Sequence, residues 1–249
     1  MKNKIIILAA GKGKRMMSDL PKPLIPVNNR AMIKYLLDSI IASKIDSKPV
    51  VVVSPTGEEI MKESLKEYNL NYAIQTEALG TGHAVSVTEN LISEDVENVL
   101  VLYGDQPFIS QKSMQKILDI HQSELSMLTV SLEDFNDWRQ GFFHWGRILR
   151  GEKGEIREIV EFKDASEEQK KITELNPAIF CFNRNWLFDN IKNLKNNNNQ
   201  KEYYLTDLVK IAFNQGVNID SCPVAASEVL GINSPEELEI VEKIIKNEK

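Results

Sequence analysis

The chain has 249 residues, 42% of them hydrophobic, and its 36 acidic and 30 basic side chains give a net charge of −6. This composition is enough for a sizeable core, so it excludes a disordered chain or a disulfide scaffold, and the acidic balance disfavours binding to long nucleic acids. Because the sequence has no apolar run of about 18 residues and no secretory signal, we expect a cytoplasmic protein without membrane partners, in which Cys181 and Cys222 are buried thiols.

The first half of the chain alternates short apolar runs with amphipathic segments. Unbroken β-branched runs are typical of parallel strands that are buried on both faces. Met32, Leu36 and Ile40 recur every four residues and predict a helix with one apolar face. This alternation predicts an α/β fold with a Rossmann-like, mostly parallel sheet and helices on both faces. The expected strands are 4–9, 49–54, 72–75 and 98–103, and the expected helices include 58–68, 82–91 and 110–122.

The second half of the chain has a different pattern. Segments 146–150 and 156–162 flank the turn 151–154 and predict a hairpin within a small mixed β subregion. Further along the chain we expect one strand and three helices, in a single domain over 1–249. The strand is expected over 175–182, helices over 186–194 and 204–215 on either side of a polar loop (195–200) with nothing apolar to bury, and a last helix that Ser234, Pro235 and Glu237 begin.

A glycine-rich turn, AGKGKRM (10–16), follows the first predicted strand. Glycines at this place let backbone N–H groups approach a phosphate closely. The turn lacks the third glycine of the dinucleotide fingerprint, where Met16 stands, and it does not match the Walker pattern. It is basic instead, with Arg15 inside it and Lys22 shortly after. We therefore predict a site for a small, highly charged anion such as a triphosphate, with a solvated surface turn as the alternative.

Seven ordered motifs resemble those of the sugar-nucleotide pyrophosphorylases, and the match covers 4–242. The chain is most similar to the uridylyltransferase domain of the bifunctional bacterial N-acetylglucosamine-1-phosphate uridylyltransferases. This resemblance implies a nucleotide-diphospho-sugar transferase fold with a nucleotide-binding half (1–125), a sugar-binding half (126–233) and a C-terminal helix (234–249). The motifs are LAAGKGKRM with LPKPL (8–16, 20–24), QTEALGTGHA (75–84), YGDQP (103–107), GRI (146–148), IVEFKDA (159–165), EYYLTD (202–207) and GIN (231–233).

The resemblance implies that an oxygen of a sugar 1-phosphate attacks the α-phosphorus of UTP, with Mg²⁺ as cofactor and pyrophosphate as leaving group. Such a reaction needs positioning and charge neutralisation more than covalent help. Arg15 and Lys22 match the residues that grip the leaving pyrophosphate. Asp105, at the end of the expected strand 98–103, and Asn233 match the two metal ligands, and oxygen ligands suit Mg²⁺.

Matching positions also imply the substrate contacts. A primary amide such as that of Gln75 can donate to uracil O4 and accept from N3–H. His83, His121 and His144 receive no role. The implied nucleotide contacts are Leu8, Ala10, Gly11, Gly13, Gln75, Gly80 and Thr81, and the implied sugar-phosphate contacts are Gly146, Glu161, Asn176, Tyr203 and Thr206.

Two departures from the family pattern fall on the sugar side. Asn176-Pro177-Ala178 stands where the family has Asn-Thr-Gly, and an aromatic stretch, 135–145, replaces a short polar turn. We expect N-acetylglucosamine 1-phosphate as acceptor, and leave open another sugar 1-phosphate, dTTP in place of UTP, or a catalytically silent nucleotide-sugar sensor. The bifunctional members continue into a β-helix of hexapeptide repeats, which this sequence lacks, so we expect no acetyl transfer and a monomer or weak dimer.

Overall fold

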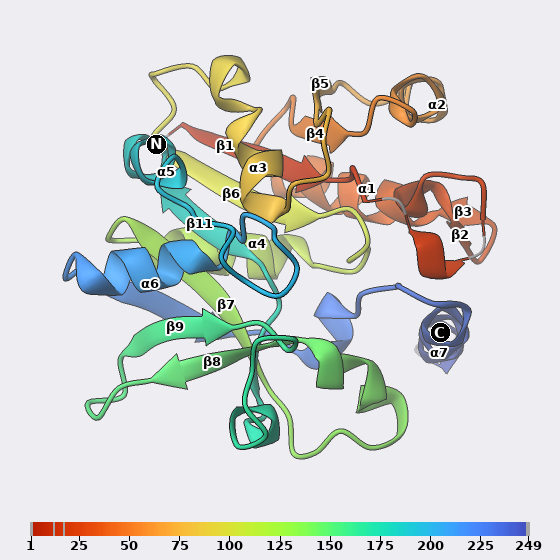
Figure 1. Cartoon of the computed structure of the whole chain (residues 1–249). Coiled ribbons are helices and arrows are strands. Elements are labelled where there is room, and N and C mark those ends of the chain that lie inside the picture. Colours follow the sequence, from red (N-terminus) through yellow and green to blue (C-terminus); the bar gives the residue numbers. More distant parts are fainter. Residues whose placement is uncertain (1, 12, 17, 248–249) are drawn as a thin grey trace.

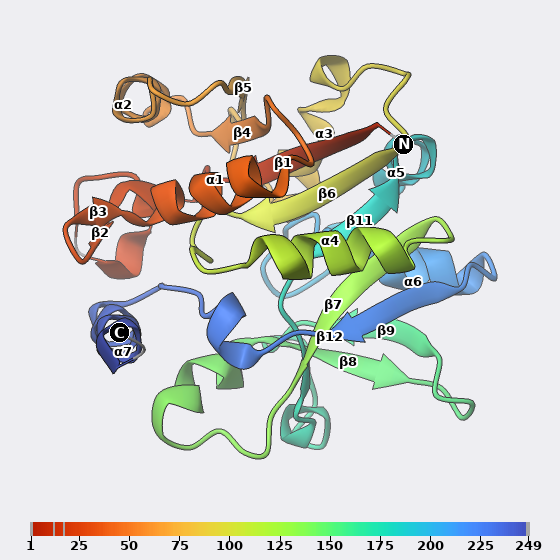
Figure 2. The same ribbon diagram turned by 180° about the vertical axis from the view of Figure 1, so that it is seen from behind.

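The computed structural model describes residues 2–11, 13–16 and 18–247, and a ten-stranded sheet runs through its middle (Figures 1 and 2). Its first four strands in space are β5 (Asn71–Ile74), β4 (Val50–Val53), β1 (Asn3–Leu8) and β6 (Asn98–Tyr103), all parallel. All four residues of β4 are fully buried, as expected for a strand covered on both faces.

Helices cover both faces of this parallel region and give the protein two apolar cores. On the face seen in Figure 2, α1 (Met32–Ser43), α2 (Glu58–Ser64) and α4 (Gln111–Ile120) contribute to one core. On the face seen in Figure 1, α3 (Thr81–Ser86), α5 (Arg184–Ile191) and α6 (Asp207–Asn214) contribute to the other. Successive strand residues alternate between the two cores because side chains of a strand point to opposite faces.

The sheet continues past β6 with strands of mixed direction. β11 (Phe180–Asn183) lies antiparallel between β6 and β7 (Leu125–Ser131). Beyond β7 come β10 (Glu174–Asn176), β8 (Gly146–Arg150) and β9 (Ile156–Val160), while β12 (Ile219–Pro223) pairs in parallel with β7. The predicted hairpin is thus β8–β9. β1, β4 to β8 and β12 share one direction, against β9 to β11, so the predicted mostly parallel fold with a mixed subregion is confirmed.

The single strand predicted over 175–182 is wrong. The chain forms two strands there, β10 and β11, which pair with different neighbours. Pro177 has no N–H to donate to a ladder, and Ala178 has a positive φ of 62°, which ends the extended conformation. The side chain of Asn176 closes the bend, since its Oδ1 accepts the N–H of Ala178 at 2.8 Å. Strands β7 and β12 were not predicted.

The remaining short elements lie at the edges of the sheet. The polar loop 195–200 is exposed for the most part, as expected, but hydrogen bonds hold it: the side chain of Asn199 donates to the carbonyl of Lys163 at 2.7 Å, and its N–H donates to Asp164 at 3.0 Å. Also present are a hairpin of β2 (Pro26–Val27) and β3 (Arg30–Ala31), and the 3₁₀ helices η1 (Lys14–Met16), η2 (Lys22–Leu24), η3 (Glu89–Leu91), η4 (Asp137–His144), η5 (Gln169–Lys171) and η6 (Ala226–Val229).

The last helix, α7 (Pro235–Asn247), begins at the predicted capping sequence. Ser234 Oγ accepts the N–H of Glu237 at 3.3 Å. The carboxylate of Glu237 reaches back past the cap to the N–H of Asn233, at 2.5 Å. Within residues 2–11, 13–16 and 18–247, no helix has the length and apolarity needed to cross a bilayer.

Candidate active site

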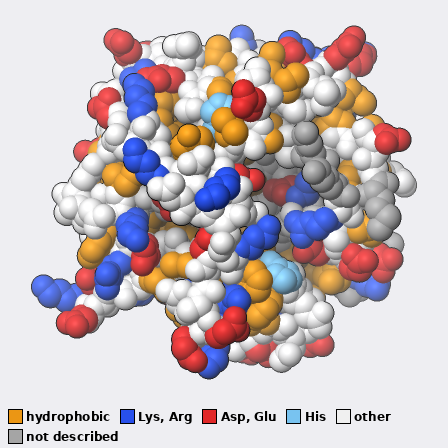
Figure 3. All heavy atoms as spheres, in the orientation of Figure 1, with side chains coloured by type: hydrophobic (Ala, Val, Ile, Leu, Met, Phe, Trp, Pro, Cys, Tyr) orange, Lys and Arg blue, Asp and Glu red, His pale blue; other side chains and the backbone are white. Residues whose placement is uncertain are grey.

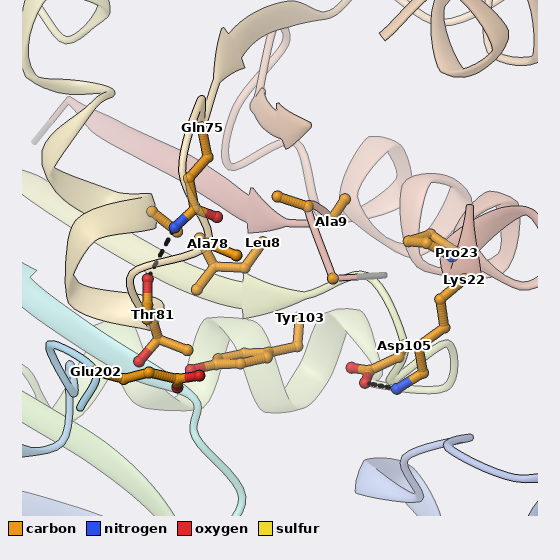
Figure 4. Close-up of a pocket in the computed structure, with 14 residues that line it drawn as sticks. Leu8, Ala9, Lys22, Pro23, Gln75, Ala78, Thr81, Tyr103, Asp105 and Glu202 are labelled. Carbon is orange, nitrogen blue, oxygen red and sulfur yellow. Dashed lines mark hydrogen bonds and ion pairs between the residues drawn. The ribbon is translucent and has the colours of Figure 1, made fainter. Parts of the chain in front are cut away.

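Two adjoining cavities open at the carboxyl ends of β1 and β6, where open α/β sheets place ligands. The first, about 280 Å³, lies between the segment after β1 and the loop before α3 (Figure 4). The second, about 290 Å³, extends toward β8 and β10. The two cavities share four lining residues, Thr81, Tyr103, Asp105 and Glu202. The two cavities therefore meet at the end of β6.

Most of the residues singled out from the sequence line one of these cavities. Three do not: Gly13, Arg15 and Tyr203 are absent from both linings. The first cavity is lined by Leu8, Ala10, Gly11, Lys22, Gln75, Gly80, Thr81 and Asp105, and the second by Thr81, Asp105, Gly146, Glu161, Asn176, Thr206 and Asn233.

Gly13 and Tyr203 do not line the first cavity but contact residues that do. Gly13 has a positive φ of 54°, and a Cβ built on it would lie 2.8 Å from Cβ of Lys22, so glycine lets the loop approach Lys22. The backbone of Tyr203 bonds the loop before α3 twice, by its N–H to the carbonyl of Leu79 at 2.7 Å and by its carbonyl to the N–H of Gly82 at 2.8 Å. The sequence motifs indicated that these two residues belong to the site, but they did not show that both contribute through their backbone and not through a side chain.

The loop before α3 orients the amide of Gln75. Gly80 has a positive φ of 110°, and a Cβ there would lie 2.6 Å from the carbonyl oxygen of Tyr203. The resulting backbone places the carbonyl of Gly80 3.0 Å from Nε2 of Gln75, which donates to it. Oε1 of Gln75 accepts no hydrogen bond from the described residues and faces the cavity (Figure 4). This oxygen can accept the imide N–H that uracil and thymine carry at N3.

His83 is a residue of this region that received no role from the sequence. Its Nδ1 lies 3.0 Å from the carbonyl oxygen of Glu77 and 3.3 Å from Nε2 of Gln75. The carbonyl can only accept, so the proton lies on Nδ1 in this arrangement. His83 therefore closes the loop from 77 to 83 beside the Gln75 amide. Its position in the sequence, directly after Thr81 and Gly82, does not predict this role.

Lys22, Asp105 and Asn233 meet where the two cavities join. The ammonium of Lys22 is bonded to the carboxylate of Asp105 and lies 2.7 Å from Oδ1 of Asn233 (Figure 4 shows the first contact). The guanidinium of Arg15 lies 3.2 Å from the same Asn233 oxygen. The carbonyl of Asp105 accepts the N–H of Ile232 at 3.0 Å, which ties the segment before α7 to the end of β6.

This donor set is compatible with Mg²⁺. One carboxylate and one amide oxygen converge on a single cationic group, and Mg²⁺ takes one or two protein oxygens and completes its shell with phosphate oxygens and water. The described residues contain no group of three or more His, Cys, Asp or Glu side chains that could hold a metal ion. With two protein oxygens, from Asp105 and Asn233, a magnesium ion would need oxygens of a nucleotide phosphate and water to complete its shell.

Three carboxylates, those of Asp105, Glu161 and Glu202, line the second cavity. Oε1 of Glu161 accepts a hydrogen bond from Oγ1 of Thr206 at 3.0 Å. Burial raises the pKa of the Glu161 carboxyl, and the nearby charges of Asp207, Asp164 and Glu202 raise it further. A cavity with acceptors of this kind suits hydroxyl groups, each of which can donate to a carboxylate oxygen.

Gln200, which the sequence did not single out, joins residues of two of the sequence motifs at the rim of this cavity. Gln200, which lines it, accepts from the ammonium of Lys163 at 2.7 Å and donates to the hydroxyl of Tyr204 at 2.8 Å. That hydroxyl donates to Asp164 at 3.3 Å. A run of asparagines and one glutamine has no chemical signature in the sequence, so this rim could be found only in the folded chain.

Asp207, at the start of α6, allows a test of whether burial raises the pKa of carboxyl groups in this region. Burial raises its pKa to about 6, above the ordinary value of 3.8, so its ionisation opposes folding. We expect Asp207→Asn to stabilise the protein at pH 7.5 by on the order of 1 kcal/mol, since the side chain is part-exposed and solvent screens the charge. The gain should shrink as pH falls through about 6 and vanish below about 4.

Thermal melting of wild type and variant between pH 4 and pH 8 measures this difference. A gain that is the same at every pH would show that Asp207 is not the titrating group.

Charged side chains of both signs are interspersed over the described residues on the face seen in Figure 3.

Comparison with known proteins agrees with the motifs. The sequence profile described as nucleotidyl transferase matches residues 4–225. The "Bifunctional protein GlmU" of Clostridium botulinum (strain ATCC 19397 / Type A) is 37% identical over 246 residues, 99% of this chain and 52% of the relative. The protein of the same name from Clostridium beijerinckii is 39% identical over 242 residues, 97% of this chain and 52% of the relative. The chain thus spans about half the length of the curated relatives it matches.

Solved structures show the same fold at low sequence identity. A putative glucose-1-phosphate thymidylyltransferase from Bacillus anthracis superposes with a TM-score of 0.76 at 18% identity, over 98% of this chain and 96% of that one. A 4-diphosphocytidyl-2C-methyl-D-erythritol synthase from Anaerococcus prevotii gives 0.68 at 14% identity, with 98% of each chain covered. The resemblance stated from the motifs is confirmed by the curated relatives, and the profile match shows that this chain belongs to the nucleotidyl transferase family of enzymes.

Proposed function

We propose that the chain transfers a uridylyl group from UTP to N-acetylglucosamine 1-phosphate, in a reaction that requires Mg²⁺ and releases pyrophosphate. One observation carries this proposal: a cavity with a free amide acceptor and a cavity lined by the carboxylate of Glu161 and the amide of Asn176 meet at Asp105, beside Lys22 and Asn233. A triphosphate bound in the first cavity would present its α-phosphorus at this junction, to an acceptor held in the second.

The residues of the first cavity bind and orient the nucleotide. Gln75 accepts the N3–H of the base through Oε1, and backbone groups of the segment after β1 approach the phosphates. Asp105 and Asn233 would hold the magnesium ion, which would neutralise charge on the phosphate oxygens. Arg15 and Lys22 exchange their contacts with Asn233 and Asp105 for oxygens of the departing pyrophosphate.

The transfer itself is a displacement at phosphorus. A phosphate oxygen of the sugar 1-phosphate forms a bond to the α-phosphorus, and the bond from this phosphorus to the oxygen that bridges to the β-phosphate breaks. Pyrophosphate leaves with the electron pair of that bond. The attacking oxygen is already ionised near neutral pH, so the protein supplies position and positive charge and no general base is needed.

The second cavity recognises the acceptor by its polar groups. Glu161 accepts from sugar hydroxyls. Asn176, only 5% exposed, uses Oδ1 for the N–H of Ala178, which leaves its Nδ2 to donate to the carbonyl of an acetamido group. Because a site that pairs a polar group disfavours an analogue without it, N-acetylglucosamine 1-phosphate should be preferred over glucose 1-phosphate.

The experiment compares kcat/KM for the two sugar phosphates at fixed UTP and Mg²⁺, by the release of pyrophosphate, and repeats it with dTTP. We expect an advantage of about tenfold or more for the acetamido sugar. Equal values, or an advantage for glucose 1-phosphate, would mean that Pro177 and Ala178 have changed the acceptor while uridylyl transfer remains. No turnover with any pair of substrates would instead favour a nucleotide-sugar sensor.

A further inference from the structure

Arg147, on β8, is a buried cation for which the proposed reaction has no use. Its side chain is 0% exposed. One guanidinium nitrogen donates to the carbonyl of Trp145 and another to the carbonyl of Lys170, at 3.0 Å, while Nε has no partner among the described residues. No carboxylate of the described residues forms an ion pair with it. A buried charge without a counter-ion is costly unless other contacts compensate.

Three aromatic rings surround this guanidinium. Its central carbon lies 5.2 Å from the ring centre of Phe135, 5.4 Å from that of Phe143 and 5.5 Å from that of Phe162. Phe143 also contacts the other two rings edge-on, with ring centres 5.2 Å apart in both pairs. Attraction between a cation and ring faces is strongest when water is excluded, as it is here. Arg147 and the three rings form a closed unit, which we term the arginine cage.

The arginine cage joins the two chain segments that form one wall of the second cavity. Phe143 is followed by His144, Trp145 and Gly146, all of which line that cavity, and Phe162 directly follows Glu161. Side chains alternate along a strand, so Arg147 lies behind this wall while its neighbour Gly146 faces the cavity. The His144 and Phe162 rings, with centres 4.8 Å apart, link the two segments a second time.

We infer that Arg147 is a positioning residue for the sugar-phosphate cavity: through the arginine cage it sets the wall formed by His144, Trp145 and Glu161. This inference rests on the proposed function for the identity of the ligand. Phe135 and Phe143 belong to the aromatic stretch that departs from the family pattern, whereas Phe162 belongs to the motif 159–165 that matches it, so the cage joins the departing stretch to a family motif. A lysine has one compact ammonium, and it cannot face three rings and two carbonyls at once as a planar guanidinium does.

The test replaces Arg147 by methionine and by lysine, with Arg157→Met as the matched control. Arg157 lies on the adjacent strand β9 and also places its guanidinium over a ring, that of Phe213 at 5.5 Å, but it is exposed. The KM values for N-acetylglucosamine 1-phosphate and for UTP are measured separately. A second measurement follows Trp145 by ¹⁹F NMR in the full chain labelled with 5-fluorotryptophan, with Trp145→Phe to assign its signal.

In Arg147→Met we expect KM for the sugar phosphate to rise about tenfold, with KM for UTP nearly unchanged and the Trp145 signal shifted. Arg147→Lys should lie between this variant and wild type, and Arg157→Met should match wild type. An equal rise in both KM values, or unchanged KM values with an unmoved Trp145 signal, would overturn the inference.

Phe143→Leu tests the arginine cage from its outer side in case the Arg147 variants do not fold. Its ring is 37% exposed, so its loss leaves the core intact, and the same selective rise in the sugar-phosphate KM is expected. If wild type turns over no sugar phosphate, the proposed function fails. The Trp145 signal of Phe143→Leu then still decides whether the arginine cage positions the wall, since an unmoved signal would refute it.

Discussion

Asp105→Ala should reduce turnover by about 10³-fold or more while the protein melts as wild type does. The carboxylate lies at the end of β6, is 23% exposed, and converges with Oδ1 of Asn233 on one cationic group. If Mg²⁺ binds there, losing its charged ligand removes several kcal/mol of charge stabilisation on the phosphates, and each 1.36 kcal/mol is a factor of ten in rate. Steady-state release of pyrophosphate measures the loss.

Two further measurements make this prediction specific. Asp119→Ala removes an exposed carboxylate from α4 and should leave the rate unchanged. Calorimetric titration of Mg²⁺ into the complex with UTP should show weakened binding in Asp105→Ala only. Substantial Mg²⁺-dependent turnover by Asp105→Ala would refute the assignment of Asp105 as a metal ligand.

Arg15→Ala and Lys22→Ala should each lower kcat by on the order of 10²-fold or more, with a smaller change in KM for UTP. Lys22 lies at the junction of the cavities, and Arg15 donates to the Asn233 oxygen that Lys22 also contacts, so both cations are close to the place where charge would develop on the departing pyrophosphate. An interaction that strengthens as the leaving group departs lowers the barrier more than it tightens binding of the substrate. Full kcat and KM determinations for UTP measure the two effects, and Lys66→Ala, an exposed lysine on the surface beyond α2, serves as the control.

The ligand-free protein offers a second readout for Lys22. Its ammonium contacts both Asp105 and Asn233, so it competes with any other cation for these oxygens. Lys22→Met should therefore bind Mn²⁺ more tightly than wild type when no nucleotide is present, as measured by electron paramagnetic resonance. In the kinetic experiment, a rise in KM for UTP with an unchanged kcat in Lys22→Ala would show that Lys22 binds the nucleotide but does not stabilise the transition state.

The periodicity of the sequence determined which segments of the first half become strands and helices. The expected strand over 98–103 is β6 to the residue, and the buried runs at 4–9 and 49–54 correspond to β1 and β4 within one or two residues. These segments are apolar on both faces, so only the middle of a covered sheet can accommodate them. Local chemistry also determined the start of α7, since a serine cap acts through its own backbone neighbours.

The second half depended on pairings that local pattern does not encode. Pro177 and Ala178 were recognised as a departure from the family, yet that they divide one expected strand into β10 and β11 followed only from the partners on either side. Likewise β7 and β12 pair with each other, but about 90 residues of chain lie between them in the sequence. Strand pairing depends on neighbours that are distant along the chain, so a window of a few residues cannot reveal it.

The sequence by itself determined the residue types of the candidate site and their order along the chain, because each motif is contiguous. Only the tertiary structure decided what those residues touch. It brought Lys22 to Asp105 and Asn233, gave Gly13 and Tyr203 supporting contacts behind the first cavity, and closed the arginine cage around Arg147. The physical reason is that burial, charge and hydrogen bonding at a site arise between segments far apart in the sequence, and these contacts exist only after the sheet has assembled.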